Sequence, residues 1–287
     1  MAKTLINILG AGRSGTTMLD LMLGNDVESF SMGEVYALFR PHRKHHFSID
    51  CNCGDPECEY WVILEKCRED EMHLKAFDIL GVNYLVDSSK YLPWVMDSSK
   101  WVRKNDNVRV VNILIYKPVI SYIYSIYKRG ESFEKALNSY KTYYKRFFQS
   151  GLDACAVSFD DLVHETDDTL KQLCVITGQQ FHEKRKEFWN KEHHHLYGSA
   201  GTRKQVNTGE SHIRTRDEFP AEFQSIYPKI QQLIQEDKIL RNVEIKLKEI
   251  DFKKQSKDQS CSDLHIVKPK WYYISKLKNK WKSKFPD

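Results

Sequence analysis

A glycine-rich turn directly after the first apolar segment constrains the fold of this sequence more than any other feature. The run Thr4–Leu9 is short and apolar, and it predicts a buried strand. The turn Gly10–Thr17 follows and leads into apolar residues at helical spacing, namely Met18, Leu19, Met22 and Leu23. Glycines let successive backbone N–H groups point at one anion, and a helix N-terminus adds its partial positive charge. The sequence therefore predicts a strand, an anion-binding loop and a helix; an ordinary glycine turn that binds no phosphate is the alternative.

The position of the cation in this loop narrows the chemistry. Gly10 and Gly15 have the G-x-x-x-x-G spacing of ATP- and GTP-binding loops, but Thr16 stands where those loops carry a lysine. The cation is Arg13 instead. The stretch Arg13–Thr17 resembles the 5′-phosphosulfate loop of sulfotransferases that use 3′-phosphoadenosine 5′-phosphosulfate (PAPS). The resemblance implies a catalytic role for Arg13 and donor binding by Gly12, Arg13, Ser14, Gly15, Thr16 and Thr17.

A glycine–glutamate pair, Gly33-Glu34, follows the first predicted helix, and a second helix is expected to begin near the glutamate. In sulfotransferases that act on sugars or tyrosine, such a pair supplies the catalytic base, because a carboxylate can take the proton of an acceptor hydroxyl. The resemblance implies this role for Glu34. The alternative is a solvent-facing glutamate that the helix dipole favours.

A second buried strand is predicted at Asn83–Val86, and it runs into Asp87-Ser88-Ser89-Lys90. Ligands of open α/β sheets bind at the carboxyl ends of the strands. This stretch resembles the second signature of the sulfotransferases, in which the lysine contacts the transferring group. The resemblance implies that Lys90 is catalytic, and a solvated loop lysine is the alternative.

The strongest predicted strand is Val108–Ile115, a near-continuous β-branched run that favours burial on both faces. Sulfotransferases usually carry an arginine at the end of this strand and a serine eight residues later, and both bind the 3′-phosphate of the donor. Lys117 and Ser125 hold this spacing here, although lysine lacks the bidentate fork of arginine and the local alignment stays open by one residue. Arg129 is a further candidate cation.

Two later segments complete the implied donor site. Ala154–Phe159 predicts a fourth strand, and the resemblance places Phe159 near adenine. The stretch 193–204 resembles a late family loop in which an arginine binds the 3′-phosphate, which implies that role for Arg203. Its three consecutive histidines suggest a metal-binding tract, but histidines in a row rarely bind one ion together.

The sequence has seven cysteines, and an odd number does not suggest a disulfide framework. Cys51, Cys53 and Cys58 have the spacing C-x-C-x4-C, which could form a thiolate metal site with Cys67, His42, His45 or His46 as fourth ligand. The paired C-x-x-C halves of a zinc ribbon are missing, however. A similar insert occurs in a subset of bacterial sulfotransferases, so we predict a structural loop without metal.

Charge is unevenly distributed along the chain. The net charge is +5, but ten lysines and three aspartates lie between Phe252 and Asp287, so the remainder is close to neutral. We therefore expect no nucleic-acid partner. We divide the chain into a sulfotransferase-like domain, residues 1–250, and a basic, aromatic tail, residues 251–287.

The end of this tail suggests a membrane contact. Trp271, Ile274, Leu277 and Trp281 recur on one helical face among lysines, which is typical of a helix lying on an anionic membrane surface. A solvated extension, or a helix docked on the body or on a second subunit, is the alternative. No apolar run approaches the length of a membrane span and no signal peptide fits, so we expect a cytoplasmic protein with possible peripheral membrane contact.

Together these observations predict a three-layer α/β, P-loop-like fold with a central parallel sheet of about five strands flanked by helices. The resemblance implies transfer of a sulfuryl group from PAPS to an acceptor hydroxyl or amine, with no metal, on a small-molecule, carbohydrate or lipid acceptor. Two other functions remain open: a P-loop small-molecule kinase, and a non-enzymatic nucleotide-binding membrane adaptor that uses the basic tail.

Overall fold

A five-stranded parallel sheet forms the centre of the protein in our computed structural model, which describes residues 3–208, 213, 218–253 and 268–284. The strand order is β2-β3-β1-β4-β5, so the first strand is also the middle one. Every pairing is parallel, and β1 pairs with both β3 and β4. The strands are β1 (Lys3–Leu9), β2 (Ser29–Gly33), β3 (Tyr84–Asp87), β4 (Val108–Tyr116) and β5 (Cys155–Ser158).

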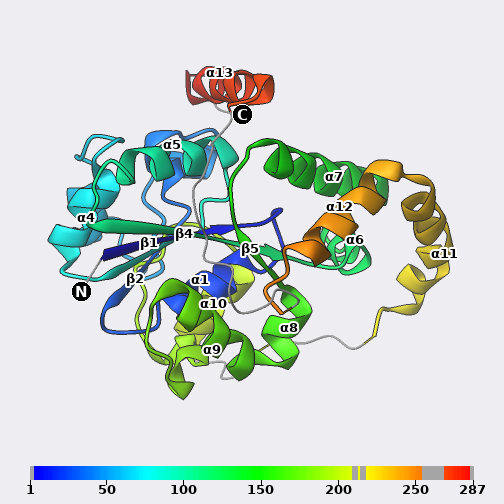
Figure 1. Cartoon of the computed structure of the whole chain (residues 1–287), viewed down its shortest axis with the longest axis horizontal. Coiled ribbons are helices and arrows are strands. Elements are labelled where there is room, and N and C mark those ends of the chain that lie inside the picture. Colours follow the sequence, from blue (N-terminus) through cyan, green and yellow to red (C-terminus); the bar gives the residue numbers. More distant parts are fainter. Residues whose placement is uncertain (1–2, 209–212, 214–217, 254–267, 285–287) are drawn as a thin grey trace.

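Helices cover both faces of the sheet, which gives the predicted three layers (Figure 1). One face packs against α1 (Thr16–Leu23), α8 (Phe159–His164) and α9 (Thr166–Thr177), with α10 (Ala200–Thr208) beside them. The other face packs against α4 (Met72–Leu80), α5 (Leu92–Val102), α6 (Val119–Tyr127), α7 (Phe133–Gln149) and α12 (Lys238–Glu249). The remaining elements are α2 (Tyr36–Phe39), α3 (Glu59–Leu64), α11 (Ala221–Glu236), α13 (Lys270–Lys284) and the 3₁₀ turns η1 (Lys44–Phe47), η2 (Glu183–Lys186) and η3 (Phe188–Asn190).

The sheet confirms the four strands expected from the sequence, and it adds β2 at one edge. This strand contains two serines, pairs only with β3 and ends at Gly33, so its apolar signal is weak. The helix expected near Glu34 is present only as the four residues of α2. Helices α11 and α12 are separated at Asp237, whose side chain accepts hydrogen bonds from the first N–H groups of α12.

The described part of the C-terminal tail packs on the body. Phe252 is buried in the same cluster as α1 and β1, and Asp251 forms an isolated bridge with Ala156. Helix α13 lies against α5, and Tyr272 is buried in that contact. No helix in the described ranges is both long and apolar enough to cross a membrane. Cys261 lies outside the described residues.

Candidate active site

The loop between β1 and α1 requires glycine at two positions. Gly10 has φ +154°, and a Cβ on it would lie 2.5 Å from the carbonyl oxygen of Ile115. Gly15 has φ +99°, and a Cβ there would lie 2.4 Å from the ring of Phe159. Any side chain at either position would clash with the neighbouring strand or with this ring. The glycines therefore let the loop lie close against β4 and β5 at the carboxyl end of the sheet.

A cavity of about 1190 Å³ opens over this loop. Nine of the twelve residues predicted for catalysis or donor binding line it. These are Gly12, Arg13, Gly15, Thr16, Thr17, Glu34, Lys90, Lys117 and Phe159. They come from the ends of β1, β2, β3, β4 and β5, so the parallel sheet gathers residues that lie far apart in the sequence. The other three, Ser14, Ser125 and Arg203, are not among the lining residues.

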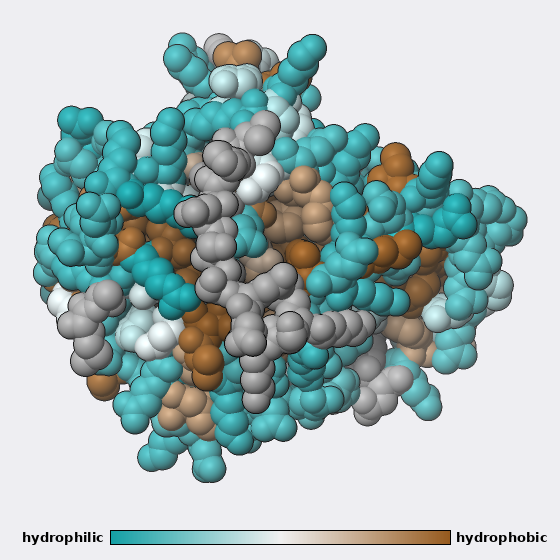
Figure 2. All heavy atoms as spheres, viewed as in Figure 1, coloured by the Kyte–Doolittle hydropathy of each residue, from teal (hydrophilic) through white to brown (hydrophobic). Residues whose placement is uncertain are grey.

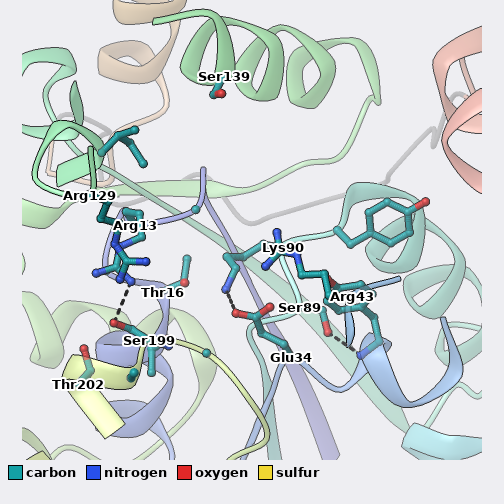
Figure 3. Close-up of a pocket in the computed structure, with 18 of the residues that line it drawn as sticks. Arg13, Thr16, Glu34, Arg43, Ser89, Lys90, Arg129, Ser139, Ser199 and Thr202 are labelled. Carbon is teal, nitrogen blue, oxygen red and sulfur yellow. Dashed lines mark hydrogen bonds and ion pairs between the residues drawn. The ribbon is translucent and has the colours of Figure 1, made fainter. Parts of the chain in front are cut away.

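Glu34 and Lys90 form an ion pair at the wall of the cavity (Figure 3). The side chains are 13% and 15% exposed, so both charges are largely withdrawn from bulk water yet open to the cavity. Lys90 has φ +58°, and its carbonyl oxygen accepts a hydrogen bond of 3.1 Å from the hydroxyl of Tyr143. The N–H of Glu34 donates to the carbonyl oxygen of Leu196 at 2.9 Å. Backbone contacts on both sides thus hold the pair in place.

Arg13 lies across the cavity from this pair, with Arg129 beside it (Figure 3). Its Nη1 donates to Ser199 Oγ at 3.1 Å, while its buried Nε has no hydrogen-bond partner in the described part of the chain. Burial and the charge of Arg129 lower the pKa of Arg13, and Glu34 acts in the opposite direction. Two guanidinium groups and a buried donor without an acceptor make a site that an anion would complete.

Lys117 and Ser125, predicted from their spacing, do lie together. Lys117 Nζ is 3.4 Å from Ser125 Oγ and 3.8 Å from the centre of the Phe159 ring. The Ser125 hydroxyl also donates to the Ser121 carbonyl at 2.9 Å. The Lys117 cation thus lies over the face of the Phe159 ring with the Ser125 hydroxyl beside it, and Lys117 and Phe159 both line the cavity.

Arg203 is not among the residues that line the cavity. Its guanidinium forms two 2.8 Å contacts with the carboxylate of Asp50, and its Nε donates to Asn52 Oδ1 at 3.1 Å. The ion pair lowers the pKa of Asp50. In this arrangement Arg203 holds the cysteine-containing loop. Its predicted contact with a 3′-phosphate stays a prediction, and the geometry does not favour Arg203 over Arg129 for that contact.

A buried polar network lies next to the backbone that leads into Glu34. Asp20 of α1 accepts a hydrogen bond of 2.6 Å from Ser31 and one of 3.1 Å from the N–H of Gly33. The ring of His195 is 2.7 Å from the same serine hydroxyl. Burial raises the pKa of Asp20 to about 7 and lowers that of His195 well below its usual value. The network connects α1 to the backbone of Gly33, immediately before Glu34.

Several residues of the site carry no recognisable signal in the sequence. The Tyr143 hydroxyl accepts the Gly10 N–H at 2.9 Å and so links the loop to the Lys90 backbone, but its sequence context is that of a core aromatic in α7. Arg43 and His42 also line the cavity. Helix α13 also reaches the cavity, through Ser275, Lys278, Asn279 and Lys282. Each of these contacts joins segments that are distant in the chain.

Comparisons with known proteins were made on the sequence and on the structure. No protein-family model and no curated protein matches the chain. Among solved structures, a sulfotransferase domain from the curacin biosynthetic pathway is 16% identical, covers 80% of this chain and 98% of its own, and has a TM-score of 0.49. A sulfotransferase domain from the olefin synthase of Synechococcus PCC 7002 is 14% identical, covers 82% of this chain and 95% of its own, and has a TM-score of 0.43. A sulfotransferase from Alicyclobacillus acidocaldarius is 15% identical, covers 83% of this chain and 98% of its own, and has a TM-score of 0.39.

Proposed function

We propose that this protein is a PAPS-dependent sulfotransferase that transfers a sulfuryl group to a hydroxyl or amine of a small-molecule, carbohydrate or lipid acceptor. The observation that carries the proposal is the position of Arg13. This arginine lies on a glycine loop, its buried Nε has no hydrogen-bond partner among the described residues, and its side chain lies across one cavity from the ion pair of Lys90 and Glu34. An anion-binding cation, a second cation and a carboxylate base are the groups that sulfuryl transfer from a nucleotide needs.

The residues fit a donor with phosphates at both ends of its ribose. Backbone N–H groups of the loop and Arg13 would hold the 5′-phosphosulfate, as at other helix N-termini that bind anions. Lys117, Ser125 and Arg129 would hold the 3′-phosphate, and the Phe159 ring offers a face to adenine. PAPS supplies the sulfuryl group and leaves as adenosine 3′,5′-bisphosphate.

The chain's own groups then have separate tasks. Glu34 takes the proton of the acceptor hydroxyl or amine as the acceptor oxygen or nitrogen attacks the sulfur of the donor. Lys90 and Thr17, which both line the cavity, would stabilise the negative charge that develops on the oxygens of the transferring sulfuryl group, while Arg13 would stabilise the departing 5′-phosphate. In the described structure Lys90 is paired with Glu34. A movement of the Lys90 side chain toward the donor would therefore release the Glu34 carboxylate to act as a base.

We expect the protein to bind adenosine 3′,5′-bisphosphate at least about tenfold more tightly than AMP, because a charge-assisted hydrogen bond contributes about 1.5–3 kcal/mol. Isothermal titration of both nucleotides measures the difference. Lys117→Ala should shrink the difference, whereas Lys171→Ala, an exposed lysine that pairs with Asp168, should leave it unchanged. Equal affinity for the two nucleotides, or tighter binding of ATP with Mg²⁺, would contradict the proposal and favour a kinase.

We further propose that α13 places the mouth of the cavity against an anionic membrane. Tyr272 and Lys276 of the helix contact Asp97, as does Lys268 just before the helix, and Asn279 donates to the Arg40 carbonyl at 3.0 Å. Its outward side carries exposed apolar residues, namely Tyr273, Ile274, Leu277 and Trp281, which are 52–68% exposed. Figure 2 shows hydrophobic atoms at the outer end of this helix between hydrophilic side chains. Further lysines on the helix complement anionic headgroups.

Vesicle co-sedimentation tests this contact. We expect binding to vesicles that contain phosphatidylserine and little binding to pure phosphatidylcholine. The double variant Ile274→Glu, Leu277→Glu should bind at least about tenfold more weakly, since each large apolar side chain contributes about 1.5–3 kcal/mol on burial. Ile245→Glu is the matched control, because this isoleucine of α12 is 56% exposed and belongs to another helix. Equal binding of both variants would contradict the assignment of this face.

A further inference from the structure

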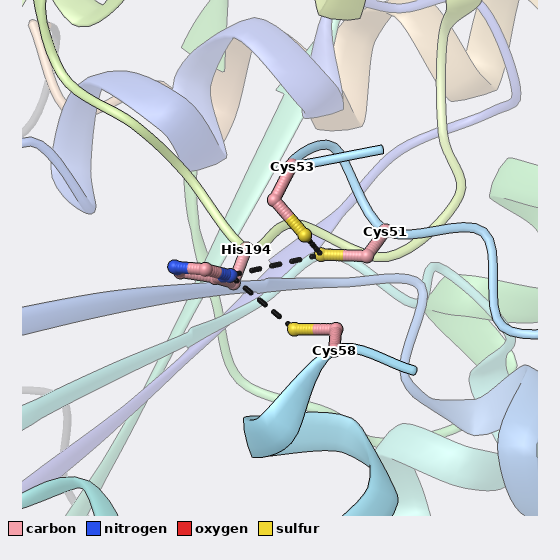
Figure 4. Close-up of side chains that lie close together, drawn as sticks. All are labelled: Cys51, Cys53, Cys58 and His194. Carbon is pink, nitrogen blue, oxygen red and sulfur yellow. Dashed lines mark hydrogen bonds between the residues drawn. The ribbon is translucent and has the colours of Figure 1, made fainter. Parts of the chain in front are cut away.

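We propose that Cys51, Cys53, Cys58 and His194 bind one zinc ion in a closed structural site. The three cysteines lie on the loop between η1 and α3, and the histidine lies 136 residues beyond the last of them, in the segment before α10. Their four potential ligand atoms are all within 4.8 Å of one another (Figure 4). The fourth ligand is none of those considered from the sequence, and this proposal departs from the metal-free loop predicted there.

The distances suit a tetrahedral zinc site. Cys53 Sγ is 3.2 Å from Cys51 Sγ, and His194 Nδ1 is 3.3 Å from Cys58 Sγ and 3.9 Å from Cys51 Sγ. Zinc with Zn–S bonds of about 2.3 Å and Zn–N bonds of about 2.0 Å places its ligands about 3.5–3.8 Å apart. Small movements of the side chains would therefore admit the ion at the centre of the four atoms. Three thiolates and one imidazole form one of the common structural zinc ligand sets.

The surroundings support a closed site. Cys51 and Cys58 are buried, and none of the four residues lines the large cavity. Trp61 Nε1 donates to the carbonyl oxygen of His194 at 2.6 Å, and the Tyr60 ring meets the imidazole edge-on at 4.5 Å. These contacts hold the histidine with Nδ1 toward the sulfurs. A site with four protein ligands leaves no position for a substrate, so the ion has a structural role.

The ion would join the cysteine loop to the segment that supports the catalytic pair. Asn52 N–H donates to the His195 carbonyl at 3.0 Å, and Tyr197 N–H donates to the Asp50 carbonyl at 3.0 Å, so the two segments already lie side by side. Leu196, in the same segment, accepts the hydrogen bond of the Glu34 N–H at 2.9 Å. A zinc clamp on His194 would therefore stiffen the backbone contact of Glu34; this consequence for catalysis, unlike the metal site, rests on the proposed function.

Metal analysis of the purified full-length protein tests the site directly. After growth with zinc and extensive dialysis, elemental analysis should find about one zinc per chain. Cys58→Ser and His194→Ala should each retain at least about tenfold less, because a structural site needs all of its ligands. Cys67→Ser is the matched control, since this cysteine lies on the same stretch but outside the cluster, and it should retain a full equivalent.

Two measurements on the wild type keep the test decisive if a variant fails to fold. Cobalt substituted for zinc should give the intense visible bands of a tetrahedral ion and a thiolate-to-cobalt charge-transfer band. Zinc should also protect Cys51, Cys53 and Cys58 from alkylation, and a chelator should expose them and lower the Tm. A protein that holds no zinc, that holds iron instead, or whose mass is lower by two hydrogens because two of these cysteines form a disulfide, would overturn the proposal. None of these outcomes depends on sulfotransferase activity.

Discussion

Glu34→Gln is expected to lower kcat by about 10²–10⁴-fold, because glutamine keeps the shape of the side chain but cannot accept a proton. The carboxylate lines the cavity, is only 13% exposed and faces Lys90. Affinity for adenosine 3′,5′-bisphosphate should be unchanged or slightly higher, since Lys90 loses its partner and remains available to an anion. Steady-state kinetics at saturating acceptor, together with titration of the nucleotide, measure both effects. The variant should also flatten the acid limb of the pH–rate profile.

The structure narrows the residues that could replace Glu34 as the base. Asp87 is fully buried, and its carboxylate contacts Trp94 Nε1 at 2.8 Å and His73 Nε2 at 2.9 Å, so it has no access to an acceptor. His42 lines the cavity, and burial lowers its pKa, which keeps the ring neutral and able to take a proton. Wild-type kcat in Glu34→Gln would therefore reject the glutamate and move the role to His42 or His45, which both line the cavity.

A matched control separates the catalytic effect from a general loss of charge. Glu183→Gln removes an exposed carboxylate in η2, outside the cavity, and should leave kcat unchanged. A large fall in the Tm of Glu34→Gln would point to a structural role, because the Lys90 pair would then contribute mainly to folding. We expect little change, since the N–H of Glu34 keeps its bond to Leu196 whatever the side chain.

Local patterns predicted most of the fold. The long β-branched run of β4 and the glycine turn after β1 are determined by a few neighbouring residues, so their sequence signals are strong. Strand β2 was missed because an edge strand of five residues with two serines has little apolar signal of its own. Its pairing with β3, which is distant in the sequence, makes it a strand.

The candidate site likewise contains residues that the sequence predicted and contacts that it could not predict. Arg13, Glu34 and Lys90 were predicted from short motifs, and the parallel sheet brings them to one cavity, since the carboxyl ends of neighbouring strands meet at the same edge. The partners of Arg203 and His194 were not predictable. Both residues contact the cysteine loop more than 130 residues earlier, and no periodicity or spacing encodes a contact over that distance.

Arg13→Ala is expected to weaken nucleotide binding and to lower kcat/KM by at least about 10²–10³-fold, the effect of removing one preorganised donor from a site of developing charge. The guanidinium has a buried Nε without an acceptor in the described residues, and Arg129 lies beside it, so in the absence of an anion the two cations repel each other. Sulfate or adenosine 3′,5′-bisphosphate should therefore raise the Tm of the wild type but raise that of Arg13→Ala much less.

The fold should survive this substitution. The only hydrogen bond that the described structure shows for the Arg13 side chain is the one to Ser199, so the Tm without ligand should stay within about 2 °C of the wild type. Arg13→Lys should recover part of the binding, because it restores the charge but not the fork of donors. Arg68→Ala, which removes an arginine that is 72% exposed, is the control and should change neither the binding nor the stabilisation by anions. If Arg13→Ala binds the nucleotide as tightly as the wild type, the loop does not hold its 5′ end; a large loss of Tm without ligand would make Arg13 structural.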